Sequence, residues 1–484
     1  MVSIVKEDID GLSALLKIKV PHADYEPKVN TVAKDYSKKL NIKGFRKGMV
    51  PLGVVKKMFG NEILAQEIDK IIQAELPKYL QDNNLNILAQ PIPVEDENIK
   101  LEVNQNNDYE FTYELGIEPE FELKALSPKT KITKYTVIID DKMLKEEMDN
   151  LRTRFGEQSQ GDSVEPESIL NVELIELKNA NEPKEGGINH ATVLPVDFFT
   201  KGSQKDIIGL KKEDSLVIKP LKAFDKDKDE IAKHILNIEE EELKNINSTF
   251  KLIIKNITNV KKAALNQDFY DKVYGKDAVK SETELKDKIK SELKVYLDEQ
   301  STKMLHSDMI LKLIDETTIQ LPEKFLKRWI KLSDENKKKN HDHKHDDHDH
   351  EHDHTPMTDE DIDKEYKNFE RGLNWSLISK KIIKANDIKV EPEEIEAGLR
   401  VWIQQQLAQT GQAFPDEELD KLVENFKGNP EYTKNVIESV TDEKIFKNIT
   451  ETLTIKDKDV NLDKFKDLVK NIGKKPKNRF KIFG

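Results

Sequence analysis

The stretch around which this chain is organised reads Lys43-Gly44-Phe45-Arg46-Lys47-Gly48-Met49-Val50-Pro51. It joins two segments with helical periodicity and places an aromatic ring among three cations, with a glycine on each side of the tip. Glycine adopts positive φ without strain, so the backbone can turn sharply here. A phenylalanine on an exposed loop forgoes the free energy of burial. The pattern predicts a loop that docks onto a large anionic partner, although an ordinary helix–helix turn with solvated lysines also fits these residues.

The segments on either side of this loop predict an α+β domain over residues 1–120. Apolar residues recur at helical spacing from Tyr25 to Leu40, and again in a long helix that Pro51 opens, because proline at the first turn loses no hydrogen bond. Alternation of apolar and polar residues predicts strands over Val2–Val20, Asn86–Val94 and Tyr109–Ile117.

Charge is distributed unevenly along the chain. The whole sequence of 484 residues has a formal net charge of −13. Residues 28–57 nevertheless contain nine cations and one anion, Asp35, which makes a net charge of +8. A concentrated basic patch on an acidic chain predicts electrostatically steered contact with a polyanion at one site.

Composition excludes several classes of protein. The sequence has no cysteine, so it has no disulfide, no thiolate nucleophile and no cysteine metal site. We expect a cytoplasmic protein, because residues 1–20 do not resemble a signal peptide and no apolar run is long enough to cross a membrane. Charged residues make up 35% of the chain and hydrophobic residues 36%, which favours domains with much surface per residue.

Residues 121–160 are predicted to form a linker, and residues 161–260 a small β-rich domain. The linker contains a strand-like run over Ile132–Ile139 and a charged helix over Asp141–Phe155, and it breaks at Gly156–Gly161. The strands predicted in the β-rich domain are Ile169–Leu177, Ser215–Pro220 and Thr249–Val260, with a helix near Asp229–Leu236.

Residues 261–484 predict an extended, all-α domain with helical arms. A capping box at Ser281–Glu284 opens a helix that runs to about Ile314. Further helix starts are predicted at Pro322, Pro356, Pro392 and Pro430. The apolar stripes of these helices are narrow, which favours arms over a globular bundle.

Several motifs resemble those of trigger factor, the ribosome-associated chaperone family of bacteria. Gly44-Phe45-Arg46-Lys47-Gly48 with Pro51 matches the family signature Gly-Phe-Arg-x-Gly-x-x-Pro. The C-terminal half resembles the family at Phe269-Tyr270, in the helix over 282–293, at Leu321-Pro322-Glu323 and over 390–395.

The resemblance implies a ribosome-docking domain, a middle domain of the FK506-binding-protein type and a helical domain that holds nascent polypeptides. It assigns contact with a ribosomal protein and rRNA near the exit tunnel to Phe45, Arg46 and Lys47. Gly44, Gly48 and Pro51 would shape the loop, and Lys43 would help electrostatically. We expect the chaperone to work without ATP, because the sequence has no nucleotide-binding Gly-x-x-x-x-Gly-Lys-Ser/Thr motif.

The middle domain departs from the pattern of an active peptidyl-prolyl isomerase, whose prolyl pocket is lined with aromatic side chains. It lacks the expected Pro-Gly-Phe-Glu segment and contains no Trp or Tyr between Gly156 and Val260. Its rings are Phe198, Phe199, Phe224 and Phe250, which are either pocket walls or ordinary core residues. We expect weak or absent isomerase activity. The alternative is an active isomerase whose helical domain recruits substrate.

A histidine-rich run over residues 341–354 holds seven of the eleven histidines. They are His341, His343, His345, His348, His350, His352 and His354. Imidazole and carboxylate groups bind Zn²⁺ and Ni²⁺, but the irregular spacing defines no closed tetrahedral site. We expect weak, adventitious metal binding and no cofactor, and a flexible solvated loop is the plainer interpretation. The rival interpretation is a metal-handling protein built around this run.

Apolar side chains in the helical domain allow two interpretations. They are Phe325, Leu326, Trp329, Phe369, Leu373, Trp375, Trp402, Ile403 and Leu407. They either pack between helices or line a cradle for unfolded chains. The sequence also leaves open whether the free protein forms a homodimer.

Overall fold

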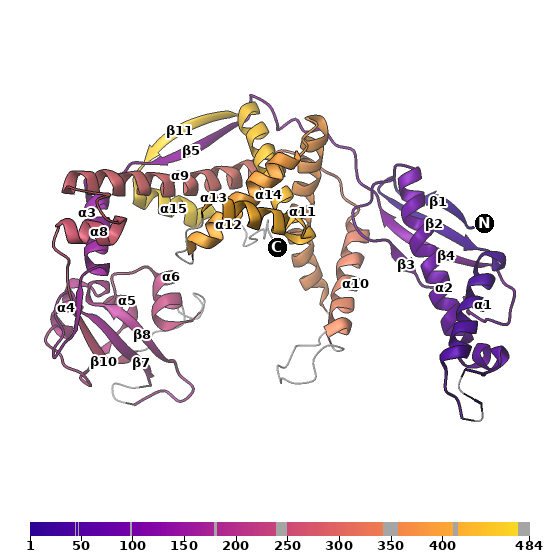
Figure 1. The fold of residues 1–484 in the computed structure, drawn as a ribbon, viewed down its shortest axis with the longest axis horizontal. Helices are drawn as coiled ribbons and strands as arrows, with labels where there is room; N and C mark the ends of the chain where they lie inside the picture. Colours follow the sequence, from indigo (N-terminus) through magenta and orange to yellow (C-terminus); the bar gives the residue numbers. More distant parts are fainter. Residues whose placement is uncertain are drawn as a thin grey trace. The chain divides into compact units, whose positions relative to one another are not determined.

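A four-stranded antiparallel sheet and two helices form the N-terminal part of the chain (Figure 1). The sheet order is β1 (Ser3–Asp8), β2 (Ser13–Val20), β4 (Tyr109–Gly116) and β3 (Ile92–Val94). Alternate residues of β2 are fully buried from Ala14 to Val20, as the period-two pattern predicts. Helices α1 (His22–Lys39) and α2 (Leu52–Asp82) share one core with this face of the sheet. The predicted α+β fold is therefore confirmed.

Two details of the sheet differ from the predictions. Residues 2–20 form a hairpin, and not a single strand, because Asp10 Oδ1 accepts the backbone N–H of Leu12 (3.1 Å) and Ser13 (2.7 Å). Gly11 completes the turn at φ +80°. The strand predicted over 86–94 is confined to β3, since the two prolines that flank Ile92 have no N–H for a longer ladder.

The middle part of the chain is built on a five-stranded sheet. Its order is β6 (Glu157–Gln160), β10 (Thr249–Lys261), β7 (Ile169–Leu177) and β8 (Asn189–Pro195), and β9 (Ser215–Ile218) also pairs with β10. Short helical segments complete its core: η1 (Val196–Phe198), α4 (Lys201–Ile207), α5 (Pro220–Ala223), α6 (Lys228–Glu230) and η2 (Ile231–Leu236).

The predicted break at residues 156–161 is wrong, because strand β6 lies there and pairs with the end of β10. The backbone of Lys261 lies very close to Gly156, and a Cβ at position 156 would collide with the carbonyl oxygen of Lys261. Strand β8 was not predicted. The helix predicted near Asp229–Leu236 is confirmed as α6 and η2.

Helices dominate the chain beyond residue 265, as predicted. They are α8 (Gln267–Tyr274), α9 (Glu282–Asp315), α10 (Glu323–His341), α11 (Asp359–Ala385), α12 (Pro392–Gln409), α13 (Asp416–Lys427), α14 (Pro430–Thr452) and α15 (Leu462–Ile472). One strand, β11 (Thr454–Val460), interrupts them and pairs with β5 (Lys131–Val137). The C-terminal part is thus helical but not purely α. Helix α3 (Asp141–Arg154) follows β5.

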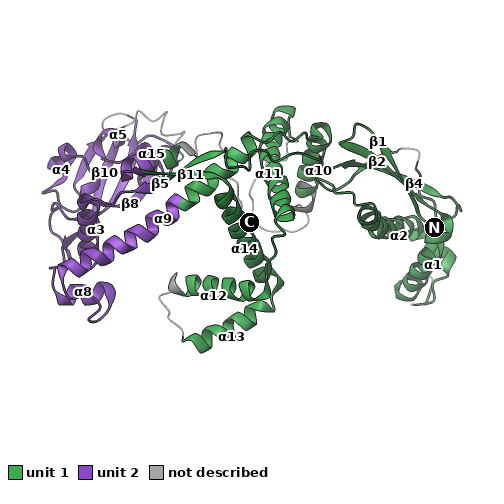
Figure 2. Cartoon of the chain, turned by 90° about the horizontal axis from the view of Figure 1, so that it is seen from above, with its two compact units in different colours: residues 1–134, 302–458, 468–484 green, residues 135–301, 459–467 purple. Residues whose placement is uncertain are grey.

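The structure is a computed structural model that describes residues 1–43, 45–46, 48–96, 99–178, 182–238, 249–341, 357–409 and 415–472. The chain divides into two compact units (Figure 2). The first contains residues 1–134, 302–458 and 468–484, and the second contains residues 135–301 and 459–467. No helix within the described ranges is long and apolar enough to cross a membrane.

Candidate functional site

The loop between α1 and α2 is built from two consecutive turns. The N–H of Phe45 donates to the carbonyl oxygen of Ile42 (3.0 Å), and the N–H of Met49 donates to that of Arg46 (2.9 Å). Gly48 sits at φ +81°, and a Cβ there would lie 3.3 Å from the carbonyl oxygen of Lys38. Both the backbone angle and the close approach require glycine at this position. Gly44 and Lys47 lie outside the described residues.

Buried residues fix the base of the loop to the domain. Val50 is only 2% exposed and belongs to the N-terminal core. The hydroxyl of Ser37, in the last turns of α1, donates to the carbonyl oxygen of Val50 (2.5 Å). Pro51 lies just before α2, and its carbonyl oxygen accepts the N–H groups of Val54 (2.9 Å) and Val55 (3.2 Å). The tip is therefore held on a rigid support.

Apolar side chains are exposed at this end of the helix pair. Phe45 is 38% exposed, Met49 70% and Met58 55%. Lys43 and Arg46 are exposed beside them. The two methionines were not among the predicted site residues, although an apolar residue next to Gly48 in the loop was the available signal. The tip thus combines apolar surface with positive charge.

The positive charge of this region faces solvent. The side chains of Lys28, Lys34, Lys38, Lys39 and Lys57 are exposed. Asp35 pairs with Lys38 at 3.1 Å, but their side chains are 55% and 72% exposed, so the pair contributes little to stability. Most of the +8 charge of residues 28–57 is therefore available to attract an anionic partner.

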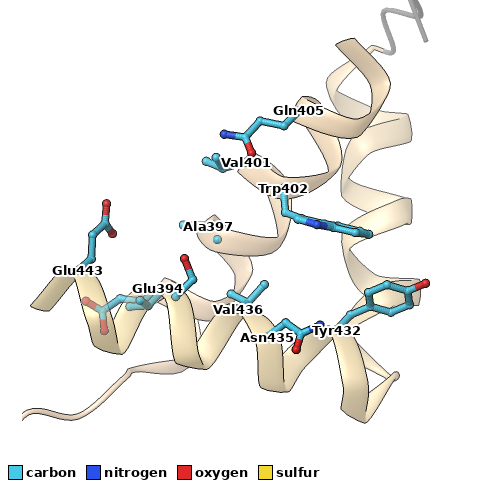
Figure 3. A pocket seen from close by; sticks show the side chains of 12 residues that line it. Glu394, Ala397, Val401, Trp402, Gln405, Tyr432, Asn435, Val436 and Glu443 are labelled. Atoms are coloured by element: carbon cyan, nitrogen blue, oxygen red, sulfur yellow. The ribbon is translucent and has the colours of Figure 1, made fainter. Parts of the chain in front are cut away.

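A second candidate site is a groove of about 540 Å³ between α12 and α14 (Figure 3). Ala397, Val401 and Trp402 lie on one helix, and Tyr432 and Val436 on the other. These apolar side chains line a groove that remains open to solvent, with Val401 52% exposed.

Both ends of this groove are braced. Trp402 packs with Phe426 and Tyr432, with ring centroids 5.5 and 5.0 Å away. Towards the start of α12, Glu394 forms an ion pair with Lys444 at 2.6 Å, and this pair lowers the pKa of the Glu394 carboxyl. The groove is therefore preformed.

The apolar residues predicted for the helical domain fall into two groups. Phe325, Leu326, Trp375 and Ile403 are buried in the cores of this part of the chain, which for Phe325 and Leu326 include strand residues as well as helices. Leu373 and Leu407 are partly buried against these cores. Trp402 lines the α12–α14 groove, and Trp329 lines a second groove of about 630 Å³ with residues of α10 and α11. The structure therefore separates core side chains from those that line open grooves, and the role of the second group as a cradle for unfolded chains stays a prediction.

The phenylalanines of the middle domain are mostly core residues. Phe199, Phe224 and Phe250 are at most 3% exposed, and the rings of Phe199 and Phe224 are 4.8 Å apart. Phe198 is partly buried, with the ammonium nitrogen of Lys226 4.0 Å from its ring centroid.

Most of the histidine-rich run lies outside the described residues. His341 is the last residue of α10. His343, His345, His348, His350, His352 and His354 lie outside the described residues. Within the described ranges, no group of three or more His, Asp or Glu side chains could hold a metal ion.

Comparison with known proteins gives one consistent family. Three family models match: "Bacterial trigger factor protein (TF)" over residues 2–151, "Probable trigger factor, FKBP-like domain" over 158–262 and "Probable trigger factor, C-terminal domain" over 301–469.

Curated relatives match along nearly their full length. Trigger factor from Francisella tularensis subsp. novicida is 25% identical over 450 residues, covering 91% of this chain and 92% of its own. Trigger factor from Treponema denticola is 25% identical over 466 residues, which cover 92% of this chain and 94% of the relative. A solved structure of the trigger factor chaperone aligns with 93% of this chain and 100% of its own at a TM-score of 0.43 and 15% identity. Because models of the N-terminal, middle and C-terminal domains of one family match in order, the chain belongs to the trigger factor family.

Proposed function

We propose that this chain is an ATP-independent chaperone that docks on the ribosome through Phe45, Arg46 and Lys47. The observation that carries the proposal is the 38% exposure of Phe45 on a loop whose base is anchored by the buried Val50. The surrounding positive charge supports a partner that contains rRNA, and the exposed ring supports an apolar contact with a ribosomal protein. Gly44, Gly48 and Pro51 would shape this loop, and Lys43 would add charge.

Co-sedimentation with ribosomes at physiological salt tests the docking surface. The full chain carrying Phe45→Ala, Arg46→Ala and Lys47→Ala should bind at least about tenfold more weakly, since a single anchor residue at an interface contributes about 2 kcal/mol or more. A matched control, Lys145→Ala with Arg154→Ala, removes two exposed cations outside the patch and should bind like the wild type. Undiminished binding by the triple variant would refute the assignment.

The helical part is proposed to hold emerging nascent polypeptides. The open grooves lined by Trp402 and Trp329 support this role, because each offers apolar surface among charged residues. Such dispersed apolar surface binds many sequences weakly and releases them without an energy source.

The middle domain is proposed to have weak or no peptidyl-prolyl isomerase activity. The support is that Phe199, Phe224 and Phe250 are used in its core, so few rings remain for a prolyl pocket. A proline-limited refolding assay with the full chain tests this. Strong catalysis would favour the alternative, an isomerase whose helical domain recruits substrate.

The remaining assignments are also proposals. We propose a cytoplasmic protein with no nucleotide and no resident cofactor. Its domains would span residues 1–120, 161–260 and 261–484, with a linker over 121–160 whose end, strand β6, joins the sheet of the middle domain. Its partners would be the ribosome and unfolded chains, and sedimentation of the free protein tests whether it forms a homodimer. Any Zn²⁺ or Ni²⁺ at residues 341–354 would be adventitious.

A further inference from the structure

The methionines of this chain differ sharply in their exposure to solvent. Of the eight, Met49 is 70% exposed and Met58 55%. By contrast, Met148, Met304 and Met309 are at most 8% exposed. The sequence contains no cysteine, so no thiol competes for an oxidant. Exposed thioethers are therefore the sulfur atoms that a dissolved oxidant reaches first.

Of the three exposed methionines, Met49 and Met58 lie at the loop end of the helix pair that carries the proposed docking surface. Met49 belongs to the loop, where its N–H donates to the carbonyl oxygen of Arg46. Met58 follows Lys57 on α2, about 9 Å along the helix axis from Leu52 at 1.5 Å per residue. Met49 therefore belongs to the basic segment of residues 28–57, and Met58 directly follows the last residue of that segment.

Met1, which is fully exposed, lies at the other end of α1. Its amino group contacts Asp24 at 3.0 Å, in the first turn of that helix. The loop follows the last residue of α1, Lys39, about 22 Å further along the axis. Met1 is thus an internal control: its sulfur is as accessible as any, but it is remote from the docking surface.

Oxidation changes the chemistry of such a surface. A peroxide transfers one oxygen atom to the thioether sulfur, so the sulfur is oxidised by two electrons and the peroxide is reduced to water. The product, methionine sulfoxide, is polar where the thioether was apolar and adaptable. A flexible apolar side chain that fills a pocket on a partner would lose that contact, and sulfoxide reductases would restore it.

We propose that Met49 and Met58 are oxidation sites through which peroxide weakens docking of this protein. The consequence for binding rests on the proposed ribosome-docking function. The oxidation sites themselves follow from exposure and position alone.

The experiment uses the full chain treated with hydrogen peroxide, quenched with catalase and divided for peptide mass spectrometry and ribosome co-sedimentation. Met49 and Met58 should oxidise at least about tenfold faster than Met309 and, with Met1, before the other methionines. Oxidised protein should bind ribosomes at least about tenfold more weakly, a difference of about 1.4 kcal/mol. Treatment with both stereospecific methionine sulfoxide reductases and dithiothreitol should restore binding.

The control is a Met49→Leu, Met58→Leu variant. Leucine conserves apolar volume but has no sulfur to oxidise, so the binding of this variant is compared with its own binding before and after peroxide. Peroxide should leave its binding unchanged although Met1 is oxidised. The proposal is overturned if both sulfurs react no faster than Met309, if oxidised wild type binds normally, or if the variant loses binding equally. If the unoxidised wild-type protein does not bind ribosomes, the docking function and its control by oxidation are both refuted. The measured oxidation rates would still show whether Met49 and Met58 are preferred oxidation sites.

Discussion

Gly116, the last residue of β4, is packed so tightly that adding one methyl group should destabilise the first unit. A Cβ at this position would lie 2.5 Å from Cδ1 and 2.6 Å from Cε1 of Phe325, and 3.3 Å from Cγ of Pro322. Carbon atoms in contact prefer about 3.5–4.0 Å, so the overlap with the ring is about 1 Å. Phe325 is fully buried among Ile330, Tyr366 and their neighbours, so its ring cannot swing aside.

The magnitude follows from two opposing effects of Gly116→Ala. Overpacking a dense core costs about 1–3 kcal/mol. Alanine also lowers the conformational entropy of the unfolded chain, which offsets about 0.4–1 kcal/mol of this cost. The offset applies because the backbone of Gly116 is not at positive φ and so accepts alanine without strain. The expected net loss in the free energy of unfolding is about 0–2.6 kcal/mol, and the tight overlap with the buried ring places it in the upper half of that range.

Urea unfolding followed by tryptophan fluorescence provides the assay, since all three tryptophans lie in the first unit. Gly53→Ala is the matched control: Gly53 is an exposed residue of α2, and a Cβ there would meet no atom within 4 Å. The control should unfold at an equal or higher urea concentration, since alanine favours helix. A midpoint for Gly116→Ala at or above that of the wild type would refute the packing argument. In a double-mutant cycle, Phe325→Leu should relieve part of the cost.

Three further predictions concern the helical part. Burial lowers the pKa of His306, whose ring stacks on Phe446 with centroids 3.9 Å apart. The neutral His306 ring therefore stabilises the fold fully above the usual histidine pKa of about 6.5, and this stabilisation declines as the pH falls below that value. Replacing His306 by Phe should therefore reduce the drop in urea midpoint between pH 7 and pH 5. Val401→Asp places a charge in the α12–α14 groove at an exposed position, so it should weaken capture of an unfolded client several-fold in an aggregation-suppression assay. It should change the free energy of unfolding by less than about 0.5 kcal/mol, and unchanged capture would argue against the groove. Deletion of residues 341–354 should abolish retention on a Ni²⁺ column while chaperone activity stays nearly intact; a large loss of that activity would indicate a functional role for the histidines.

Local signals in the sequence were sufficient for most of the elements. Helix starts were predictable at Pro392 and Pro430, because a proline at the first turn costs no hydrogen bond. The signature loop was also predictable from local sequence, because its glycines and the two periodic segments that flank it are features of neighbouring residues. Strand β11 was missed because its outward residues are charged and its partner is distant, with Thr454 bonded to Pro128 across 326 positions.

The amino-acid sequence by itself determined the helices, the main strands, the basic patch and the resemblance to one chaperone family. These features depend on periodicity, charge and short motifs, which are properties of neighbouring residues. Only the tertiary structure decided which apolar side chains are core and which remain exposed. Ile403 and Trp402 are adjacent in sequence and both apolar, yet one is 3% exposed in a core and the other lines an open groove. Exposure depends on which other helices cover a side chain, and that is a long-range property that no local pattern encodes.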